Sequence, residues 1–309
     1  MRLCIDLGGS SVRGALMSGG NVLGTLAAAR SDSFDIGELE MFVDESLAKF
    51  RAHDVTGVAV AVPGVTNAGK STLISAHGKY SALLGVDLRS WASRRLEVPF
   101  GLENDARAAL TGELAFGVAT GEKDAVLMIL GTGIGTAAVI DGVQLYGRHG
   151  HAGILGGHVT IDRNAATCPC GNVGCAESIA STWALNSALE EAPDFSDSAW
   201  ARESAAQGMK SLVILAKRGD ELSKRVLAHF INAWAITLVS LCHAYDPEVV
   251  IVTGGVLQST EIVPQLQSYV NAHLWSSSYR PRLLVPAHPQ LSVMRGLSAL
   301  ELTALDDGR

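Results

Sequence analysis

A short apolar strand, a glycine turn and a returning strand follow one another twice in this chain, and this pattern constrains the fold most strongly. The first copy spans residues 3–17 and the second spans residues 125–140. Elsewhere, further strand patterns alternate with helical patterns, which is typical of an α/β protein. The two copies suggest two related halves, although two similar hairpins can also arise by chance.

The length of the chain sets the expected number of domains. A chain of 309 residues is too long for one small core and fits two domains of ordinary size. We predict a smaller N-terminal α/β domain at residues 1–117 and a larger α/β domain at residues 118–295. A last helix at about residues 296–309 is expected to fold back onto the first domain.

Composition and charge exclude several classes of protein. A hydrophobic content of 48% and a charged content of 18% describe a globular protein with ample core material. The net charge of −7 argues against a nucleic-acid partner and against an anionic membrane surface. No signal peptide and no apolar run of membrane-spanning length are evident, so we expect a cytoplasmic protein. Cys4 and Cys242 stand in apolar runs and are expected to be buried thiols in a reducing compartment.

The other three cysteines predict a metal site. Cys168, Cys170 and Cys175 lie within eight residues, separated by glycines, and His158 lies ten residues before the first of them. Three thiolates and one imidazole form a closed tetrahedral zinc site, which leaves no open position for a substrate water. The alternative, three unpaired thiols in a loop, does not account for the spacing. We therefore expect a structural Zn²⁺ in the larger domain.

Three glycine turns, at residues 6–10, 131–135 and 253–256, each follow a strand. Glycine lets backbone N–H groups approach phosphate oxygens without a Cβ in the way. Taken singly, each is more often an ordinary turn, and the second lacks the Lys-Ser/Thr pair of a P-loop. Together they suggest a nucleotide held between two domains. The predicted phosphate contacts are Gly8, Gly9, Ser10, Thr132, Gly133, Gly254 and Gly255.

Polar residues at two strand ends are candidates for metal binding and proton transfer. Asp6, at the end of the first strand, can hold Mg²⁺ through water, or it can simply cap the turn. Asn104 and Asp105 follow a second strand, where Asp105 can accept a proton and Asn104 can bind hydroxyl groups. Local sequence alone favours a helix cap for this pair.

Taken in order along the chain, these motifs resemble those of the ROK family of sugar kinases, repressors and open reading frames. The resemblance covers almost the whole chain, and its most specific part is the cysteine run followed by Glu177. It implies the actin-like ATPase (ribonuclease H-like) fold, with two α/β domains around an interdomain cleft. It also implies ATP and Mg²⁺ as cofactors, and phosphoryl transfer to a hexose hydroxyl, usually the 6-OH. The matching elements are Asp6-Leu-Gly-Gly-Ser10, Asn104-Asp105-Ala106, Gly131-Thr-Gly-Ile-Gly135, Gly157-His158, the Cys-x-Cys-Gly-x-x-Gly-Cys-x-Glu run and Gly254-Gly255.

The resemblance assigns roles to individual residues. Asp105 matches the general base of the family and Asn104 matches its sugar-binding neighbour, which reverses the preference for a simple helix cap. Glu177 matches a glutamate that contacts the sugar. His158 matches a residue that both ligates zinc and borders the sugar, so the zinc is expected to fix the loop that carries the sugar contacts.

Two sugar-reading loops depart from the family pattern. The family usually shows Gly-Glu-x-Gly-His, and here Leu155 takes the place of the glutamate. The loop after Gly64, a predicted sugar contact, usually leads to an Asn and a Gly-Trp pair, but here it leads to His77 and Lys79. His77 is also a predicted sugar contact. His77 and Lys79 can bind an anionic or modified sugar, or they are ordinary surface residues.

Two functions compete. The first is an ATP-dependent sugar kinase, and the second is a sugar-binding pseudokinase or regulator. ROK repressors carry a helix-turn-helix ahead of the first strand, and this chain begins that strand by residue 3, so we expect no DNA-binding segment. The expected partners are a sugar and ATP, without nucleic acid or membrane. The family resemblance also implies a homo-oligomer, either a dimer or a tetramer.

Overall fold

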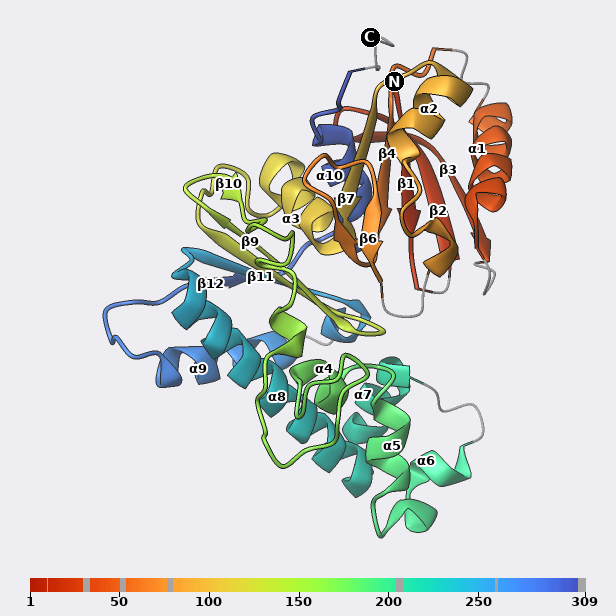
Figure 1. Ribbon diagram of the computed structural model, residues 1–309. Helices are drawn as coiled ribbons and strands as arrows, with labels where there is room; N and C mark the ends of the chain where they lie inside the picture. Colours follow the sequence, from red (N-terminus) through yellow and green to blue (C-terminus); the bar gives the residue numbers. More distant parts are fainter. Residues whose placement is uncertain are drawn as a thin grey trace. The chain divides into compact units, whose positions relative to one another are not determined.

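The computed structural model of the chain divides into two compact units (Figure 1). It describes residues 1–9, 11–29, 34–50, 54–76, 80–203, 208–258 and 261–304. Unit 1 consists of Met1–Gly121, Gln144–Ala152 and Pro286–Arg309. Unit 2 consists of Glu122–Val143 and Gly153–Val285. The units therefore differ from the predicted division at residues 117 and 295, chiefly because residues 144–152 belong to unit 1.

Unit 1 is built on one sheet of five strands: β1 (Arg2–Leu7), β2 (Ser11–Ser18), β3 (Asn21–Ala29), β4 (Val58–Val62) and β7 (Phe100–Asn104). The strand order is β3-β2-β1-β4-β7. β1 pairs antiparallel with β2 and parallel with β4, and β7 runs parallel to β4. The hairpin of β1 and β2 confirms the first predicted strand–turn–strand copy. The sequence analysis missed β3, whose residues alternate between exposed and half-buried instead of forming a buried run.

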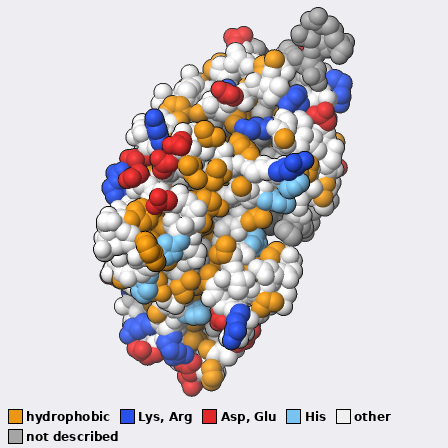
Figure 2. Space-filling view, turned by 60° about the vertical axis from the view of Figure 1, so that its left-hand side comes forward, with side chains coloured by type: hydrophobic (Ala, Val, Ile, Leu, Met, Phe, Trp, Pro, Cys, Tyr) orange, Lys and Arg blue, Asp and Glu red, His pale blue; other side chains and the backbone are white. Residues whose placement is uncertain are grey.

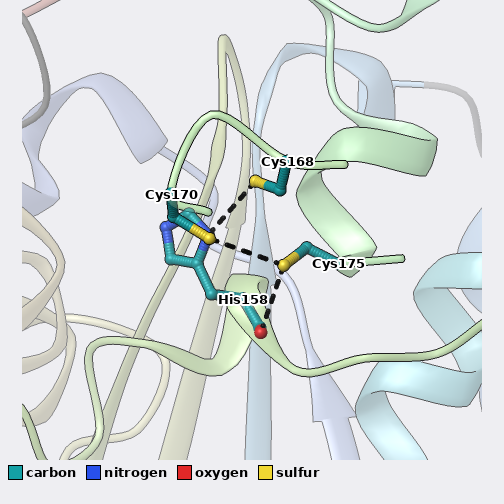
Figure 3. A group of neighbouring side chains, drawn as sticks. All are labelled: His158, Cys168, Cys170 and Cys175. Carbon is teal, nitrogen blue, oxygen red and sulfur yellow. Dashed lines mark hydrogen bonds between the residues drawn. The ribbon is translucent and has the colours of Figure 1, made fainter. Parts of the chain in front are cut away.

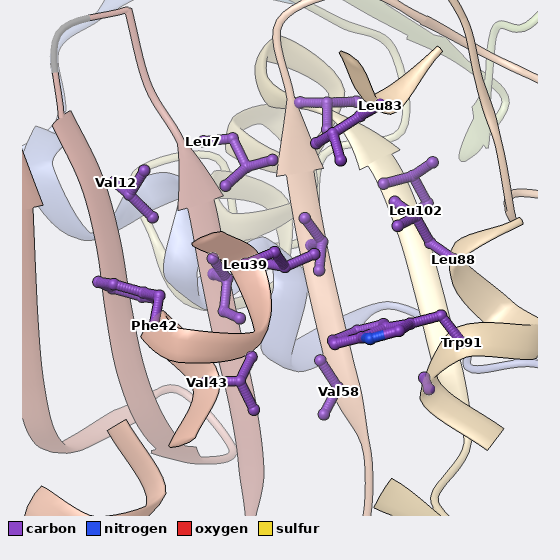
Figure 4. Close-up of a cluster of buried hydrophobic side chains, with 14 of the residues drawn as sticks. Leu7, Val12, Leu39, Phe42, Val43, Val58, Leu83, Leu88, Trp91 and Leu102 are labelled. Carbon is purple, nitrogen blue, oxygen red and sulfur yellow. The ribbon is translucent and has the colours of Figure 1, made fainter. Parts of the chain in front are cut away.

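The two faces of this sheet are covered by different helices. Helices α1 (Ile36–Phe50) and α2 (Leu88–Leu96) cover one face. There Leu39 and Phe42 of α1 and Trp91 of α2 pack on alternate strand residues such as Leu7 and Val58 (Figure 4). Apolar residues at positions 39, 42, 43 and 47 predict a helix over residues 38–51, and α1 begins two residues earlier, at Ile36. Asp35 and Glu38 explain this, because each side chain accepts a hydrogen bond from the other residue's backbone N–H.

The opposite face of the sheet is covered by α3 (Asp105–Phe116) and α10 (Ser292–Ala299). The predicted last helix at 296–309 is wrong in its bounds, because the helix begins at Ser292 and ends at Ala299. A Cβ at Gly296 would lie 1.7 Å from the carbonyl oxygen of Ala108, so the two helices pack backbone against backbone. Residues 300–304, the described part of the chain after α10, are not helical, and Thr303 pairs with Phe100 of β7.

Unit 2 repeats the sheet of unit 1. Its strands are β8 (Ala125–Leu130), β9 (Ile134–Ile140), β10 (Val143–Gln144), β11 (Val249–Thr253) and β12 (Arg282–Leu284). The order β10-β9-β8-β11-β12 places an antiparallel hairpin beside two parallel strands, as in unit 1. The second predicted hairpin is therefore confirmed. The two sheets have the same strand order, which supports two related halves.

The helices of unit 2 include α4 (Ala176–Ala180), α5 (Leu185–Glu190), α6 (Ala199–Arg202), α7 (Gly208–Lys217), α8 (Glu221–Tyr245) and α9 (Ile262–His273). Helix α5 overlaps residues 187–198, a polar stretch whose composition predicts a loop. Leu185 and Leu189 of α5 are buried, and this anchoring explains a helix in a polar stretch.

Helix α8 contradicts the expectation that no apolar run in the sequence is long enough to span a membrane. Within the described ranges it is the one helix long and apolar enough to cross a membrane, by length and composition alone. Half of its apolar window, 50%, is buried inside the structure. The core helix of a globular protein passes the same test, and this burial accounts for the apolar side chains without a membrane.

Candidate functional site

Carboxylates occupy one row of the sheet of unit 1. Asp6 of β1 lies opposite Ala61 of β4, and Ala61 lies opposite Glu103 of β7. Residues paired across neighbouring strands point to the same face, so Asp6 and Glu103 share a face, two strand spacings or about 10 Å apart. Asp105 follows as the first residue of α3. The strand ends of unit 1 thus collect three acidic side chains.

Asp6 is almost completely buried, with 3% of its surface exposed. The Arg13 guanidinium of β2 donates a hydrogen bond to its Oδ2 atom. Burial raises the pKa of the Asp6 carboxyl, and the neighbouring Arg13 offsets this only in part. Among the described residues Oδ1 has no hydrogen-bond partner, so it is the oxygen of Asp6 that could hold a water bound to Mg²⁺.

The turn after Asp6 is tight and is held from a distant loop. The Gly8 N–H donates to the Ser11 carbonyl at 3.0 Å, and a Cβ at Gly8 would lie 2.8 Å from the same oxygen. The buried Tyr80 hydroxyl donates to the Gly8 carbonyl at 2.6 Å. Gly9 lies in this turn and is half-buried. Of the predicted phosphate contacts here, Ser10 lies outside the described residues.

Asn104 caps helix α3, as its local sequence suggested. Its side-chain oxygen accepts hydrogen bonds from the backbone N–H groups of Ala106 and Arg107, at 3.0 and 3.1 Å. Its Nδ2 donates to the Gly64 carbonyl at 3.1 Å, which joins the ends of β7 and β4. Both lone pairs of the oxygen are therefore used, and only one Nδ2 proton remains for a ligand. The half-buried Asp105 begins the helix directly beside this cap.

Glu103 is the centre of a buried cluster that the sequence analysis missed. Its Oε1 accepts from the Asn104 backbone N–H at 2.8 Å, and its Oε2 accepts from the Tyr146 hydroxyl at 2.5 Å. Lys70 Nζ lies 3.4 Å from Oε2, and Arg107 Nη1 lies 3.8 Å from Oε1. Both cations also lie over the Tyr146 ring, at 4.6 and 4.4 Å from its centroid. Burial, and then the Glu103 charge, raise the pKa of the Tyr146 hydroxyl.

Arg107 explains why residues 144–152 join unit 1. Its side chain is fully buried and donates to the carbonyl of Leu145 at 3.0 Å, and to those of Gly150 and Ala152 at 2.8 Å each. Glu103 lies on β7 and Arg107 in the first turn of α3, and the spacing of opposite charges four residues apart is the signal from which the pair could have been inferred. Its long-range carbonyl partners leave no comparable signal in the sequence.

In unit 2, the predicted phosphate turns lie side by side. Leu130 ends β8 just before the turn that holds Thr132 and Gly133. Gly254 follows β11 with φ +135°, and a Cβ there would lie 2.0 Å from the Leu130 carbonyl oxygen. Gly255 is exposed, with open space around it. The structure therefore brings the four predicted phosphate contacts of unit 2 to one edge of its sheet.

Glu177 lies against this edge. Its Oε2 accepts a hydrogen bond from the Ile134 backbone N–H at 2.8 Å. A Cβ at Gly133 would lie 2.4 Å from the same oxygen, so glycine at 133 makes room for the carboxylate. Glu177 was expected to contact the sugar. The structure shows that one of its oxygens is already bound to the backbone beside the turn.

The predicted zinc ligands come together in one cluster (Figure 3). The ligand atoms of His158, Cys168, Cys170 and Cys175 all lie within 4.8 Å of one another. Cys168 Sγ lies 3.7 Å from His158 Nδ1, and Cys170 Sγ lies 3.7 Å from Cys175 Sγ. A tetrahedral Zn²⁺ with Zn–S bonds of about 2.3 Å separates its ligands by about 3.8 Å. The donor set and its spacing therefore fit zinc.

Two of the three thiols in this cluster lose their protons less readily than an ordinary cysteine. Burial, followed by the neighbouring thiols, raises the pKa of Cys175 to about 12, and burial raises the pKa of Cys168. The Cys170 pKa is lowered in spite of its burial, because the Asn172 N–H and the neighbouring thiols donate to its sulfur. Three thiolates this close repel one another, and a bound zinc ion would hold all three deprotonated.

Asn172 orients the cluster and was missed from the sequence. Its Nδ2 donates to the His158 carbonyl at 3.1 Å, to the Thr160 hydroxyl at 3.0 Å and to Cys175 Sγ at 3.4 Å. Hydrogen bonds of this kind fix the ligands of a metal site. Its place between two glycines of the cysteine run is the only signal that the sequence offers.

The predicted sugar contacts fall into two groups. Gly64 and Asn104 lie in unit 1, together with the predicted base Asp105, while His158 and Glu177 lie in unit 2. His77 and its neighbour Lys79 lie outside the described residues. Leu155, which stands where the family has glutamate, is 43% exposed in unit 2.

Fold and site together define a class of protein. Each unit has a five-stranded sheet of the same order with glycine turns at strand ends, and solved structures that match the chain are ROK sugar kinases of the actin-like ATPase fold. The expected fold of two α/β domains is thereby confirmed. The chain itself belongs to the ROK family, because the model of that family matches residues 2–304.

Individual relatives include both enzymes and regulators. A glucokinase of Thermotoga maritima is 35% identical over 166 residues, which cover 52% of this chain and 52% of that protein. A xylose repressor of Bacillus subtilis is 26% identical over 236 residues, which cover 76% of this chain and 58% of the repressor. The matched part is thus little more than half the length of each of these relatives.

A solved structure aligns over nearly the whole chain. It is a ROK family glucokinase from Streptomyces griseus in complex with glucose and AMPPNP. The two chains align with a TM-score of 0.81 and 24% identity, over 96% of this chain and 98% of that one. At this level of identity the likeness shows the fold.

Proposed function

We propose that the protein is an ATP-dependent sugar kinase, which transfers the γ-phosphoryl group to a hydroxyl of a hexose or hexose derivative. The observation that carries the proposal is the pair Asn104–Asp105 at the end of β7. Asn104 caps α3 and bonds to Gly64, so the first residue of the helix, Asp105, is held at a fixed place. The glucokinase relatives support this reading.

In this proposal Asp105 accepts the proton of the attacking sugar hydroxyl. A hydroxyl is a poor nucleophile, and a positioned carboxylate removes its proton as the phosphoryl group leaves ATP. Asn104 donates its remaining Nδ2 proton to a sugar hydroxyl. Asp6 would hold a water of the Mg²⁺ that accompanies ATP, and Mg²⁺ supplies charge neutralisation at the phosphates. The backbone N–H groups of the glycine turns bind phosphate oxygens.

The zinc ion has a structural role in this proposal. His158 and the three cysteines would hold it with all four positions filled, which excludes a substrate water. Its contribution is to fix the loop and the short helix α4 that carries Glu177. We predict one Zn²⁺ per chain. Metal analysis of protein purified without added zinc checks this, and a content well below one with full activity would contradict it.

The sugar preference should differ from that of an ordinary glucokinase. Leu155 stands where a family glutamate accepts hydrogen bonds from sugar hydroxyls, and leucine accepts none. A hydroxyl left without a partner costs about 1–3 kcal/mol, or roughly ten- to a hundredfold in affinity. Glucose should therefore be a poor substrate, and sugars with an apolar or anionic substituent at that hydroxyl should be better ones.

A coupled ADP-release assay with Mg-ATP tests both statements. The panel is glucose, mannose, allose, fructose and their N-acetyl derivatives. Leu155→Glu restores the family residue at a half-exposed position and should raise kcat/KM for glucose by about tenfold or more. If no sugar releases ADP, the kinase proposal fails. If glucose is the best wild-type substrate with a sub-millimolar KM, the role of Leu155 is wrong.

A regulator that binds sugar without phosphoryl transfer is the second candidate. The xylose repressor of Bacillus subtilis, which matches 76% of this chain, favours it. Calorimetric binding of a sugar together with no ADP release would support the regulator. The mixture of acidic and basic side chains on the face in Figure 2 gives no sign of a nucleic-acid surface there. The predicted dimer or tetramer can be checked by light scattering.

A further inference from the structure

The turn at residues 131–135 is held by groups outside its own hairpin. Within the hairpin, the Gly131 N–H donates to the Gly133 carbonyl at 3.0 Å. From outside, the Thr182 N–H donates to the Gly131 carbonyl at 3.1 Å, and the Trp183 N–H donates to the Thr132 carbonyl at 3.4 Å. These anchors follow α4, the short helix that begins directly after Cys175 of the zinc cluster.

Glu177 supplies the remaining anchor, from within α4. Its Oε2 accepts from the Ile134 N–H at 2.8 Å, just beyond the turn. The carbonyls of Gly131 and Thr132 and the N–H of Ile134 are thus all occupied. The N–H groups of Thr132 and Gly133 donate to no other group of the described chain. Two adjacent donors held in this way suit an anion.

The position of the Glu177 carboxylate beside a turn that suits an anion needs an explanation. Glu177 repels a phosphate group through its charge, and that cost is offset only if the carboxylate does something for the turn. Its contact with Ile134 fixes the backbone at the residue that follows the two unoccupied donors. Glycine at position 133 leaves room for this contact, because a Cβ there would lie 2.4 Å from Glu177 Oε2. The position of Cys175, two residues earlier, sets where the carboxylate lies.

We propose that Glu177 is a positioning residue for the phosphate-binding turn, through which the zinc cluster determines nucleotide affinity. This rests on the proposed kinase function. It adds a role that is separate from the expected contact of Glu177 with the sugar. The hydrogen bond to Ile134 holds the turn ready before any sugar is bound, so its loss should weaken nucleotide binding in the absence of sugar.

Calorimetry with Mg-AMPPNP and no sugar tests the proposal on the zinc-loaded protein. Glu177→Ala should bind the nucleotide about tenfold more weakly than the wild type. Glu177→Gln keeps an oxygen that can accept from Ile134 and should bind within about threefold of the wild type. Glu190→Ala removes the same charge from an exposed position on α5 and should change nothing. Zinc content is measured on every variant, so that loss of the cluster is recognised.

Two results overturn the proposal. If Glu177→Ala binds Mg-AMPPNP as the wild type does, the carboxylate does not position the turn. If the wild type itself binds no Mg-AMPPNP, the kinase function fails, and this inference fails with it. A role in sugar binding alone gives a different pattern: both Glu177 variants raise the KM for sugar and leave nucleotide affinity unchanged.

Hydrogen exchange gives a readout that does not need ligand or activity. The Ile134 amide should exchange about tenfold faster in Glu177→Ala than in the wild type, because its acceptor is gone. Gly133→Ala provides a second variant that retains the carboxylate, since its new methyl group displaces Oε2 from Ile134. It should also speed the exchange of Ile134 and weaken Mg-AMPPNP binding. Unchanged exchange in both variants contradicts the proposal.

Discussion

The two units have the same sheet but end their strands with different chemistry. In unit 1 the strand ends carry side chains with charge: Asp6 on β1, Glu103 on β7 and Asp105 directly after it. In unit 2 the ends of β8 and β11 lead into glycine turns, and the nearby carboxylate, Glu177, comes from a helix beside the zinc cluster. One sheet thus offers carboxylates, and the other offers backbone N–H groups.

In the proposed kinase reaction, this difference would give the two units different tasks. Carboxylates suit proton transfer and metal-bound water, whereas backbone N–H groups suit phosphate oxygens. It also predicts different weak points. Unit 1 should lose most when a buried charge is removed, while the strand-end turns of unit 2 should be sensitive to an added Cβ.

The largest effect is expected for Arg107→Ala in unit 1. The buried guanidinium bonds to three carbonyls and faces Glu103, so its removal leaves a buried carboxylate with fewer partners. Loss of one member of a buried ion pair costs about 3–5 kcal/mol. Urea denaturation followed by fluorescence measures this change in unfolding free energy. The matched control is Arg94→Ala, an exposed residue of α2, which should change stability by about 0.5 kcal/mol or less. Equal stability of the two variants would show that the buried cluster is not what unit 1 depends on.

The next effect is on turnover. Asp105→Asn keeps the shape of the side chain and should preserve folding and sugar binding. It removes the proton acceptor, so kcat should fall by roughly a hundredfold or more. The coupled ADP-release assay measures kcat with the best sugar of the panel, and calorimetry confirms that the sugar still binds. A near-normal kcat would show that Asp105 is not the general base. The assignment of proton transfer to unit 1 would then be wrong.

A smaller effect is expected from one methyl group in unit 2. Gly254→Ala places a Cβ at φ +135°, 2.0 Å from the Leu130 carbonyl, where backbone must move to admit it. Strain of this kind costs about 1–3 kcal/mol. Gly255→Ala is the matched control for stability, because a Cβ there meets nothing within 4 Å. The melting temperatures of both variants measure this difference in stability. Equal melting temperatures would show that the close approach of Gly254 to Leu130 does not require glycine.

The sequence predicted what depends on local pattern. Both hairpins, the α/β class and the gathering of His158 with three cysteines follow from residues that are near in sequence. The cap by Asn104 was also visible as an alternative. Each of these features can be predicted from periodicity, turn residues or ligand spacing within a single short segment of the sequence.

What the sequence did not predict depends on distant partners. Tyr146 donates to Glu103, and Arg107 donates to the Leu145 carbonyl, each across about forty residues of chain. Glu177 accepts from Ile134 across a similar separation. A lone tyrosine or arginine carries no sign of such a partner. The last helix was misplaced for the same reason, because its bounds are set by backbone packing of Gly296 on α3.

The place of α10 in unit 1 has a consequence for synthesis on the ribosome. Cys4, Ala59 and Ala108 share a core with Met294 and Leu297, so the early strands of unit 1 complete their core only with a helix made after every strand of unit 2. Until residues 292–299 emerge, this face of the N-terminal sheet is covered by α3 without α10, while all strands of unit 2 are already available. A nascent chain stopped before residue 292 should therefore contain a finished unit 2 and an unfinished unit 1, and the part of the sheet that α10 later covers is where a chaperone would bind.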